Sequence, residues 1–138
     1  MNAVVDTNVI AYHLLASEPF VDEVEGFWRL VAQPSAPSIW EAELVNVLAM
    51  SARQGVATPE RSRAALDDAA ALGIRSVGNR SLWRTALEIA SRTRTSGYDA
   101  LFIALALREK CALITFDKKL LTSFPDVAKR PGALARRH

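Results

Sequence analysis

The sequence contains very little cysteine and histidine. Cys111 is the only cysteine among 138 residues, which excludes a disulfide framework and a zinc site built from cysteines. The two histidines are His13 and His138, and the second of them is the last residue of the sequence. The sequence therefore gives little support for a mechanism that needs a pair of histidines or a Ser-His-Asp triad.

Long hydrophobic runs are also missing. The longest strongly apolar run covers residues 100–107 and is too short to cross a bilayer. The first residues lead directly into a strand-like run, so no secretory signal is expected. The default expectation is a soluble cytoplasmic protein that does not engage a membrane.

The charges nearly balance over the whole chain but not along it. The sequence has 17 Lys and Arg residues against 15 Asp and Glu residues. Residues 1–74 carry ten acidic and four basic side chains, whereas residues 75–138 carry five acidic and thirteen basic ones. This asymmetry suggests a cation site beside an anion-binding surface, although surface charges also scatter unevenly by chance.

Apolar strand-like runs alternate with helical stretches through one domain, residues 1–138. Hydrophobic residues make up 50% of the chain, enough for a sizeable core. Short runs of apolar and β-branched residues predict strands at residues 3–5, 35–39, 74–77 and 112–115. Helical spacing and capping residues predict helices at 8–16, from 19, at 40–54, at 59–72, after a Ser81 cap, at 98–110 and from 118. The alternation predicts an α/β fold with a parallel sheet and helices on both faces.

Acidic residues recur where such a fold places ligands, at the carboxyl ends of parallel strands. Asp6 follows the first predicted strand, Asp117 follows the fourth, and Asp99 opens the predicted buried helix. A glutamate stands in the first turns of the helix that follows the second strand. Carboxylates gathered in this way repel one another, by about 4 kcal/mol for two charges ~4 Å apart. They therefore hold protons with raised pKa values or bind a hard cation such as Mg²⁺ or Mn²⁺. The chemistry that this suggests is metal-assisted attack of water on a phosphodiester.

Each of these acids also has a purely structural interpretation. Asp6 and Asp117 are good N-caps for the helices that follow them, and Asp99 interacts favourably with a helix dipole. On a helical wheel Glu41 and Glu43 flank the apolar stripe on opposite sides, each about 80° from its middle. Periodicity alone does not choose between these two glutamates.

Four stretches together resemble the PIN domain family, and more narrowly the VapC-type toxins of bacterial type II toxin–antitoxin pairs. They are Val4-Val5-Asp6-Thr7-Asn8-Val9, Glu43-Leu44 with Val47-Leu48, Tyr98-Asp99-Ala100 with Ala104-Leu105-Ala106, and Ile114-Thr115-Phe116-Asp117 with Leu120. The resemblance covers nearly the whole chain. It implies a three-layer α/β/α sandwich around a parallel sheet, with an acidic quartet that binds Mg²⁺ or Mn²⁺ and cleaves single-stranded RNA.

The resemblance also implies roles for individual residues. Asp6 and Asp99 would be the main metal ligands, and Asp117 would complete the metal site directly or through water. The family pattern places its acid before Leu-x-x-Val-Leu, which selects Glu43, acting through a water molecule on the metal. The residues that would support these acids by hydrogen bonds are Thr7, Asn8 and Thr115.

RNA and protein partners follow from the same resemblance. The basic residues expected to bind RNA phosphates are Arg84, Arg92, Arg94 and Lys118. Tyr98 either stacks on a base or packs against the protein. Toxins of this kind form homodimers and are neutralised by a VapB-like antitoxin. The residues Phe20, Phe27 and Trp28 are candidates for contact with that partner, with core packing as the alternative.

Three other functions compete with the toxin. The first alternative is a PIN-type RNA-processing nuclease without an antitoxin, and the second is a catalytically silent module that binds RNA or protein. A phosphatase with Asp6 as the nucleophile is disfavoured, because the second acid expected two residues later is Asn8.

Overall fold

A five-stranded sheet divides the molecule into layers. The computed structural model describes residues 1–135, and residues 136–138 of the predicted domain lie outside the described part. The strands are β1 (Asn2–Val5), β2 (Gln33–Pro37), β3 (Arg75–Val77), β4 (Leu113–Ile114) and β5 (Ala128–Lys129). They lie in the order β3-β2-β1-β4-β5, and every pair of neighbours is parallel. The prediction of a parallel sheet is confirmed.

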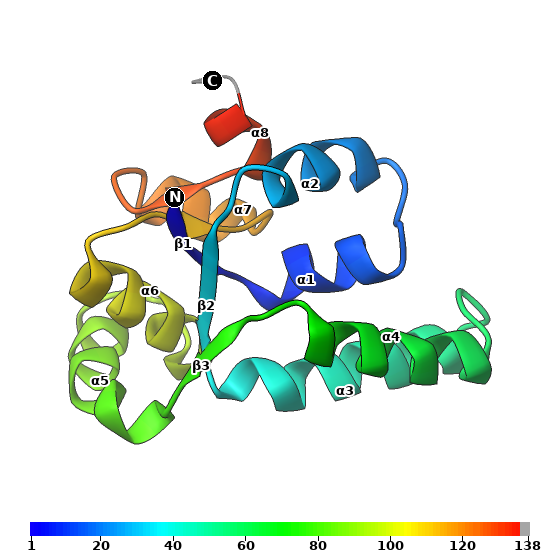
Figure 1. The fold of residues 1–138 in the computed structure, drawn as a ribbon. Coiled ribbons are helices and arrows are strands. Elements are labelled where there is room, and N and C mark those ends of the chain that lie inside the picture. Colours follow the sequence, from blue (N-terminus) through cyan, green and yellow to red (C-terminus); the bar gives the residue numbers. More distant parts are fainter. Residues whose placement is uncertain (136–138) are drawn as a thin grey trace.

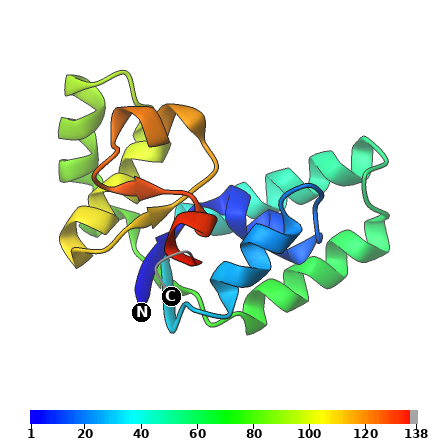
Figure 2. The same cartoon turned by 90° about the horizontal axis from the view of Figure 1, so that it is seen from above.

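Helices cover both faces of this sheet (Figures 1 and 2). One layer contains α1 (Thr7–Leu14), α2 (Val21–Trp28), α3 (Ile39–Arg53) and α4 (Pro59–Ala71). The other layer contains α5 (Trp83–Arg92), α6 (Gly97–Glu109) and α7 (Lys118–Ser123). A 3₁₀ turn, η1 (Asn79–Ser81), precedes α5, and the short α8 (Pro131–Ala135) packs on α2. This arrangement is the expected three-layer α/β/α sandwich.

Helix α6 is the central helix that its apolar sequence predicted. It packs against β1 and β2 and buries Phe102, Ile103 and Leu105 almost completely. The helix begins after Ser96, whose hydroxyl accepts a hydrogen bond from the backbone N–H of Asp99 at 3.1 Å. It ends at Lys110, which adopts a left-handed conformation with φ of 54°. The cap at one end and the burial along its length fix where Asp99 lies.

The sheet differs from the prediction at β2 and β5. Strand β2 begins at Gln33 and ends at Pro37, earlier than the predicted range 35–39. The backbone N–H groups of Ala32 and Gln33 donate to the carbonyl of Met1, so pairing with β1 sets where β2 begins. Strand β5 was not predicted, because Ala128-Lys129 stands among charged residues and prolines and not in an apolar run; it forms through hydrogen bonds with the β4 region.

The start of α5 also differs from the prediction. Ser81 does not cap this helix; it lies in η1, and its hydroxyl donates to the carbonyl of Gly78 at 2.8 Å. Helix α5 buries little apolar surface, because Ala86 is buried whereas Trp83 and Leu87 are 56% and 69% exposed. The hydrogen bond from Arg108 to Ser81 joins the start of α5 to the end of α6, so the two helices run antiparallel.

The aromatic residues of the α1–α2 region belong mainly to the core. Phe27 is completely buried, so the interpretation of Phe27 as a partner contact is wrong and core packing is correct. Phe20 is half-buried and stacks on Tyr12 with ring centroids 4.4 Å apart, and Trp28 is also partly buried. As for membrane insertion, no helix within residues 1–135 is long and apolar enough to span a bilayer.

Candidate active site

The sheet brings three of the predicted acids to its carboxyl edge. Strand β1 ends at Val5, and the backbone N–H of Asp6 still donates to the carbonyl of Ile114 in β4 at 2.9 Å. Asp117 follows β4 as the N-cap of α7, and Asp99 lies in the first turn of α6. Because β1 and β4 are parallel neighbours, their carboxyl ends deliver these acids to one place.

A cavity of about 410 Å³ at this edge contains all four predicted acids. It is lined by Asp6, Glu43, Asp99 and Asp117, together with Thr7, Asn8, Ile39, Ala42, Asn46, Val47 and Tyr98. Glu41 instead lines a separate cavity beside Trp40 and Leu66. The direction in which α3 leaves the sheet therefore separates the two glutamates that the helical wheel could not.

Hydroxyl groups connect the acids to one another. The carboxylate of Asp6 accepts a hydrogen bond from the backbone N–H of Thr7 at 2.8 Å and another from the hydroxyl of Thr115 at 2.7 Å. The oxygen of that same hydroxyl accepts from the backbone N–H of Asp117 at 3.0 Å. The hydroxyl of Thr7 donates to Glu43 at 2.8 Å. Thr7 thus hydrogen-bonds to the carboxylates of Asp6 and Glu43, and Thr115 hydrogen-bonds to the carboxylate of Asp6 and to the backbone of Asp117.

Asn8 acts on the backbone rather than on a carboxylate. Its side-chain oxygen accepts a hydrogen bond from the backbone N–H of Phe116 at 3.4 Å, which joins the start of α1 to the segment after β4. This contact fixes the distance between the loops that carry Asp6 and Asp117.

The capping roles of Asp6 and Asp117 are present alongside their place in the cavity. Asp6 caps α1, and one oxygen of Asp117 accepts from the backbone N–H groups of Lys119 and Leu120 at 2.8 and 3.3 Å. A carboxylate has about four acceptor positions, so these bonds leave capacity for a further ligand. Capping and a function in the cavity are therefore compatible.

Burial and mutual repulsion raise the pKa values of three of these acids. Burial raises the pKa of Asp6 to about 7, helped by the charges of Asp99 and Glu43 and opposed by hydrogen bonds from Thr115 and Thr7. Burial also raises the pKa of Asp99, and the charge of Asp117 adds to that rise. The pKa of Glu43 is raised by burial and by Asp99, against its hydrogen bond from Thr7. Raised acid pKa values clustered in one cavity are typical of functional sites.

The oxygen-only set of side chains suits a hard cation. Within residues 1–135, no three His, Cys, Asp or Glu side chains form a group that could hold a metal ion as they stand. Mg²⁺ is commonly bound by only one or two carboxylates, with water and substrate phosphates completing its shell. The buried Asp6, with raised pKa and free acceptor capacity, fits a cation that takes the place of a proton.

The residues expected to bind RNA are divided between two places. Arg94 and Lys118 line a second cavity that also includes Asp99. Arg84 lies in the first turn of α5, toward the end of the antiparallel α5–α6 pair that is opposite Asp99. Arg92 lies in the last turn of α5, nearer the second cavity. The structure therefore does not gather the four basic residues at one point.

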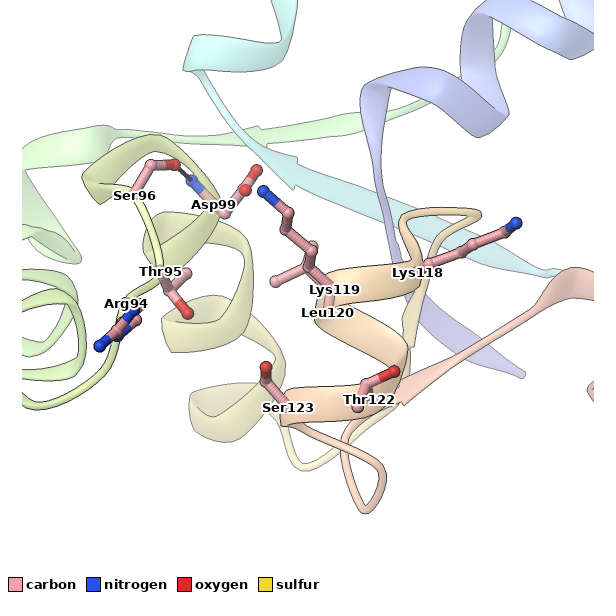
Figure 3. Close-up of a pocket in the computed structure, with 9 residues that line it drawn as sticks. All are labelled: Arg94, Thr95, Ser96, Asp99, Lys118, Lys119, Leu120, Thr122 and Ser123. Carbon is pink, nitrogen blue, oxygen red and sulfur yellow. Dashed lines mark hydrogen bonds between the residues drawn. The ribbon is translucent and has the colours of Figure 1, made fainter.

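Two further residues lie at the site, Lys119 and Ser96. Lys119 is directed toward the carboxylate of Asp99, whereas the amino group of Lys118 is directed away from it (Figure 3). Ser96 positions Asp99 through the cap of α6. A signal for Ser96 was present as Ser-Gly-x-Asp at a helix start, but nothing in the sequence distinguishes the two lysines. Tyr98 is 63% exposed on the acidic cavity, so the packed interpretation of this residue is wrong.

The fold and the cavity define an α/β/α domain with an acidic site at the carboxyl edge of a parallel sheet. The family model for the PIN domain matches residues 3–129, and the chain belongs to the PIN domain family. No match was found among the curated proteins.

Two solved structures share the fold. A chain of a toxin–antitoxin complex from Klebsiella pneumoniae is 18% identical, with a TM-score of 0.65, over 94% of this chain and 97% of that one. A chain of the VapBC2 structure from Rickettsia felis, bound to a DNA fragment from its promoter, is 19% identical, with a TM-score of 0.62, over 94% of this chain and 98% of that one.

Proposed function

We propose that this protein is a Mg²⁺- or Mn²⁺-dependent endoribonuclease that cleaves single-stranded regions of RNA and acts as the toxin of a toxin–antitoxin pair. The observation that carries the proposal is the cavity in which Asp6, Glu43, Asp99 and Asp117 come together. The raised pKa of Asp6 supports it, because a buried carboxylate of this kind is stabilised by exchanging its proton for a cation.

Each acid has a distinct part in this proposal. Asp6 and Asp99 bind the cation, and Asp117 completes the site directly or through water. When bound, the cation activates water and neutralises charge on the phosphate that is attacked. Glu43 orients the attacking water from the α3 side, and Thr7 holds its carboxylate in place through the 2.8 Å hydrogen bond. Thr115 holds the carboxylate of Asp6 and the backbone of Asp117 in fixed relative positions through its two hydrogen bonds.

The RNA strand contacts the basic side of the acidic cavity. Arg92, Arg94 and Lys118 lie on this side, and they bind phosphates without reading sequence. Arg84, at the far end of α5, would extend the same surface to a more distant phosphate. Tyr98 is free to stack on a base, because its ring is largely exposed beside the acids.

The partners are proposed from the family and from the two solved structures. The first of these is a toxin–antitoxin complex and the second is VapBC2, which supports a VapB-like antitoxin as the partner of this chain. The homodimer and the cytoplasmic site of action rest on the family resemblance. Light scattering of the purified protein, alone and with the product of a short upstream reading frame, tests both assemblies. If no such reading frame exists, the toxin assignment fails and an RNA-processing PIN nuclease remains.

The reaction is tested with a labelled single-stranded RNA under a titration of Mn²⁺. We expect cleavage that requires the cation, is abolished in Asp6→Asn and Asp99→Asn, and is retained in the matched variant Asp67→Asn on the exposed face of α4. Thermal unfolding in the same titration should show that Mn²⁺ raises the Tm of the wild-type protein and of Asp67→Asn, but not of Asp6→Asn or Asp99→Asn. Full activity in EDTA would exclude the proposal, and a flat thermal shift without cleavage would favour a silent binding module.

A further inference from the structure

A second cavity adjoins the acidic one and shares Asp99 with it. Its volume is about 490 Å³, within the range of about 300–1,000 Å³ that ligand sites occupy. It lies between the segment that precedes α6 and the helix α7 (Figure 3). Its lining residues are Arg94, Thr95, Ser96, Asp99, Lys118, Lys119, Leu120, Thr122 and Ser123.

The lining of this cavity is basic and rich in hydroxyl groups. Arg94 lies on the α6 side and Lys119 on the α7 side, with the amino group of Lys119 directed toward Asp99 (Figure 3). Thr95, Thr122 and Ser123 add hydroxyls that both donate and accept hydrogen bonds. No aromatic ring is among the lining residues. Such a surface suits a phosphate and a sugar rather than the face of a base.

We propose that this cavity is a subsite for one nucleotide of the RNA strand, next to the phosphate that is cleaved, with Lys119 and Arg94 binding its phosphate and the hydroxyls of Thr95 and Ser123 binding its ribose. The proposal rests on the proposed function and adds to it the path of the substrate. It also assigns a role to Lys119 that the sequence did not separate from that of Lys118.

The shared Asp99 is the reason to prefer RNA over an acidic peptide as the occupant. A strand whose phosphate lies among the acids must continue past them on both sides, and the second cavity begins at Asp99. The ribose 2′-hydroxyl is a donor and an acceptor, which the threonine and serine hydroxyls can match.

The first test removes the charge of Lys119 in a protein that binds RNA but does not cleave it. In an Asp6→Asn background, Lys119→Gln should weaken binding of a labelled single-stranded RNA by about threefold to fivefold, the size of one exposed charge pair. The slope of log K against log salt should fall by about 0.7, because one phosphate of the strand is no longer neutralised by the protein. Lys110→Gln, which removes the same charge at the opposite end of α6, should leave both values unchanged. Lys118→Gln should have a smaller effect than Lys119→Gln.

The second test fills the cavity without changing its charge. Ser123 is exposed at the last position of α7, so Ser123→Leu adds bulk to the cavity at little cost to folding. In the otherwise active protein it should raise KM for RNA by at least about threefold and leave the Mn²⁺ concentration for half-maximal activity unchanged. Ala64→Leu on the exposed face of α4 is the matched control. Replacing single riboses of the substrate by deoxyribose should lower affinity at one position next to the cleaved bond, and that loss should disappear in Ser123→Leu.

The outcomes separate this proposal from the proposed function. If the wild-type protein cleaves RNA with Mn²⁺ but Lys119→Gln and Ser123→Leu match their controls, the subsite is wrong and the nuclease stands. A loss with Lys119→Gln alone also overturns the subsite, since the charge beside Asp99 and not the cavity would then matter. If both variants impair binding of an acidic partner peptide and not of RNA, the occupant is wrong. If no metal-dependent cleavage occurs in any variant, the proposed function itself fails.

Discussion

Replacing Asp6 by asparagine should stabilise the metal-free protein at neutral and alkaline pH. Asp6 is only 7% exposed, and burial raises its pKa from 3.8 to about 7, with the charges of Asp99 and Glu43 contributing to the rise. Hydrogen bonds from Thr115 and Thr7 oppose it but do not cancel it. Ionisation of Asp6 is therefore unfavourable in the folded protein.

The sign and size of the effect follow from proton linkage. The unfolded chain releases this proton near pH 3.8, whereas the folded protein keeps it to about pH 7. Between these values the folded state binds more protons, so the free energy of unfolding falls as the pH rises through that window and stays lower above it. A tenfold change in acid dissociation is worth about 1.4 kcal/mol, so full ionisation costs up to about 4 kcal/mol. Asparagine avoids this cost but makes weaker hydrogen bonds, which leaves a net gain of about 2–3 kcal/mol at pH 8.

The assay is urea unfolding in EDTA at pH 5 and pH 8. Asp6→Asn should be more stable than the wild-type protein at pH 8, and the difference should shrink by more than half at pH 5. The exposed variant Asp67→Asn, which removes the same charge, should change little at either pH. Mn²⁺ should then stabilise the wild-type protein and not Asp6→Asn. If Asp6→Asn is less stable than the wild-type protein at pH 8, the ionised carboxylate is favourable as a cap, and the argument from burial is refuted.

Three other predictions concern the acids and the core. Glu43→Gln should lower kcat for RNA cleavage by at least about 100-fold, whereas Glu41→Gln, in a separate cavity, should not; equal losses would show that charge alone matters. Thr115→Val should destabilise the protein by about 1–3 kcal/mol, because it removes one buried and one partly buried hydrogen bond, and should move the pH dependence of unfolding to higher pH by raising the pKa of Asp6 further; an unchanged pH profile would contradict this. Phe27→Ala should cost about 3–5 kcal/mol in urea unfolding, since the ring is completely buried, and a loss below about 1 kcal/mol would contradict that burial.

Much of the fold could be predicted because its elements carry local signals. The buried β1, the apolar α6 and the capped α4 are each visible in runs of three to fourteen residues, and the structure has them close to where they are expected. The failures lie where no local signal exists. Strand β5 has two residues, and β2 is positioned by the carbonyl of Met1 in another segment. At α5 an amphipathic pattern was present, but the helix buries Ala86 and leaves Trp83 largely exposed.

The candidate site, like the fold, could be predicted only in part from the sequence. The residue types alone set the available chemistry, namely oxygen ligands without cysteine or usable histidine, and the order of elements placed Asp6, Asp99 and Asp117 where a parallel sheet collects them. Helical periodicity left Glu41 and Glu43 open and the family resemblance favoured Glu43; the packing of the folded chain shows that Glu43 faces these acids and that Lys119 and not Lys118 is directed toward Asp99. Packing also buries Asp6 deeply enough to hold a proton near pH 7. Side-chain direction across a cavity and the dielectric around a carboxylate depend on atoms supplied by distant segments, which no local pattern encodes.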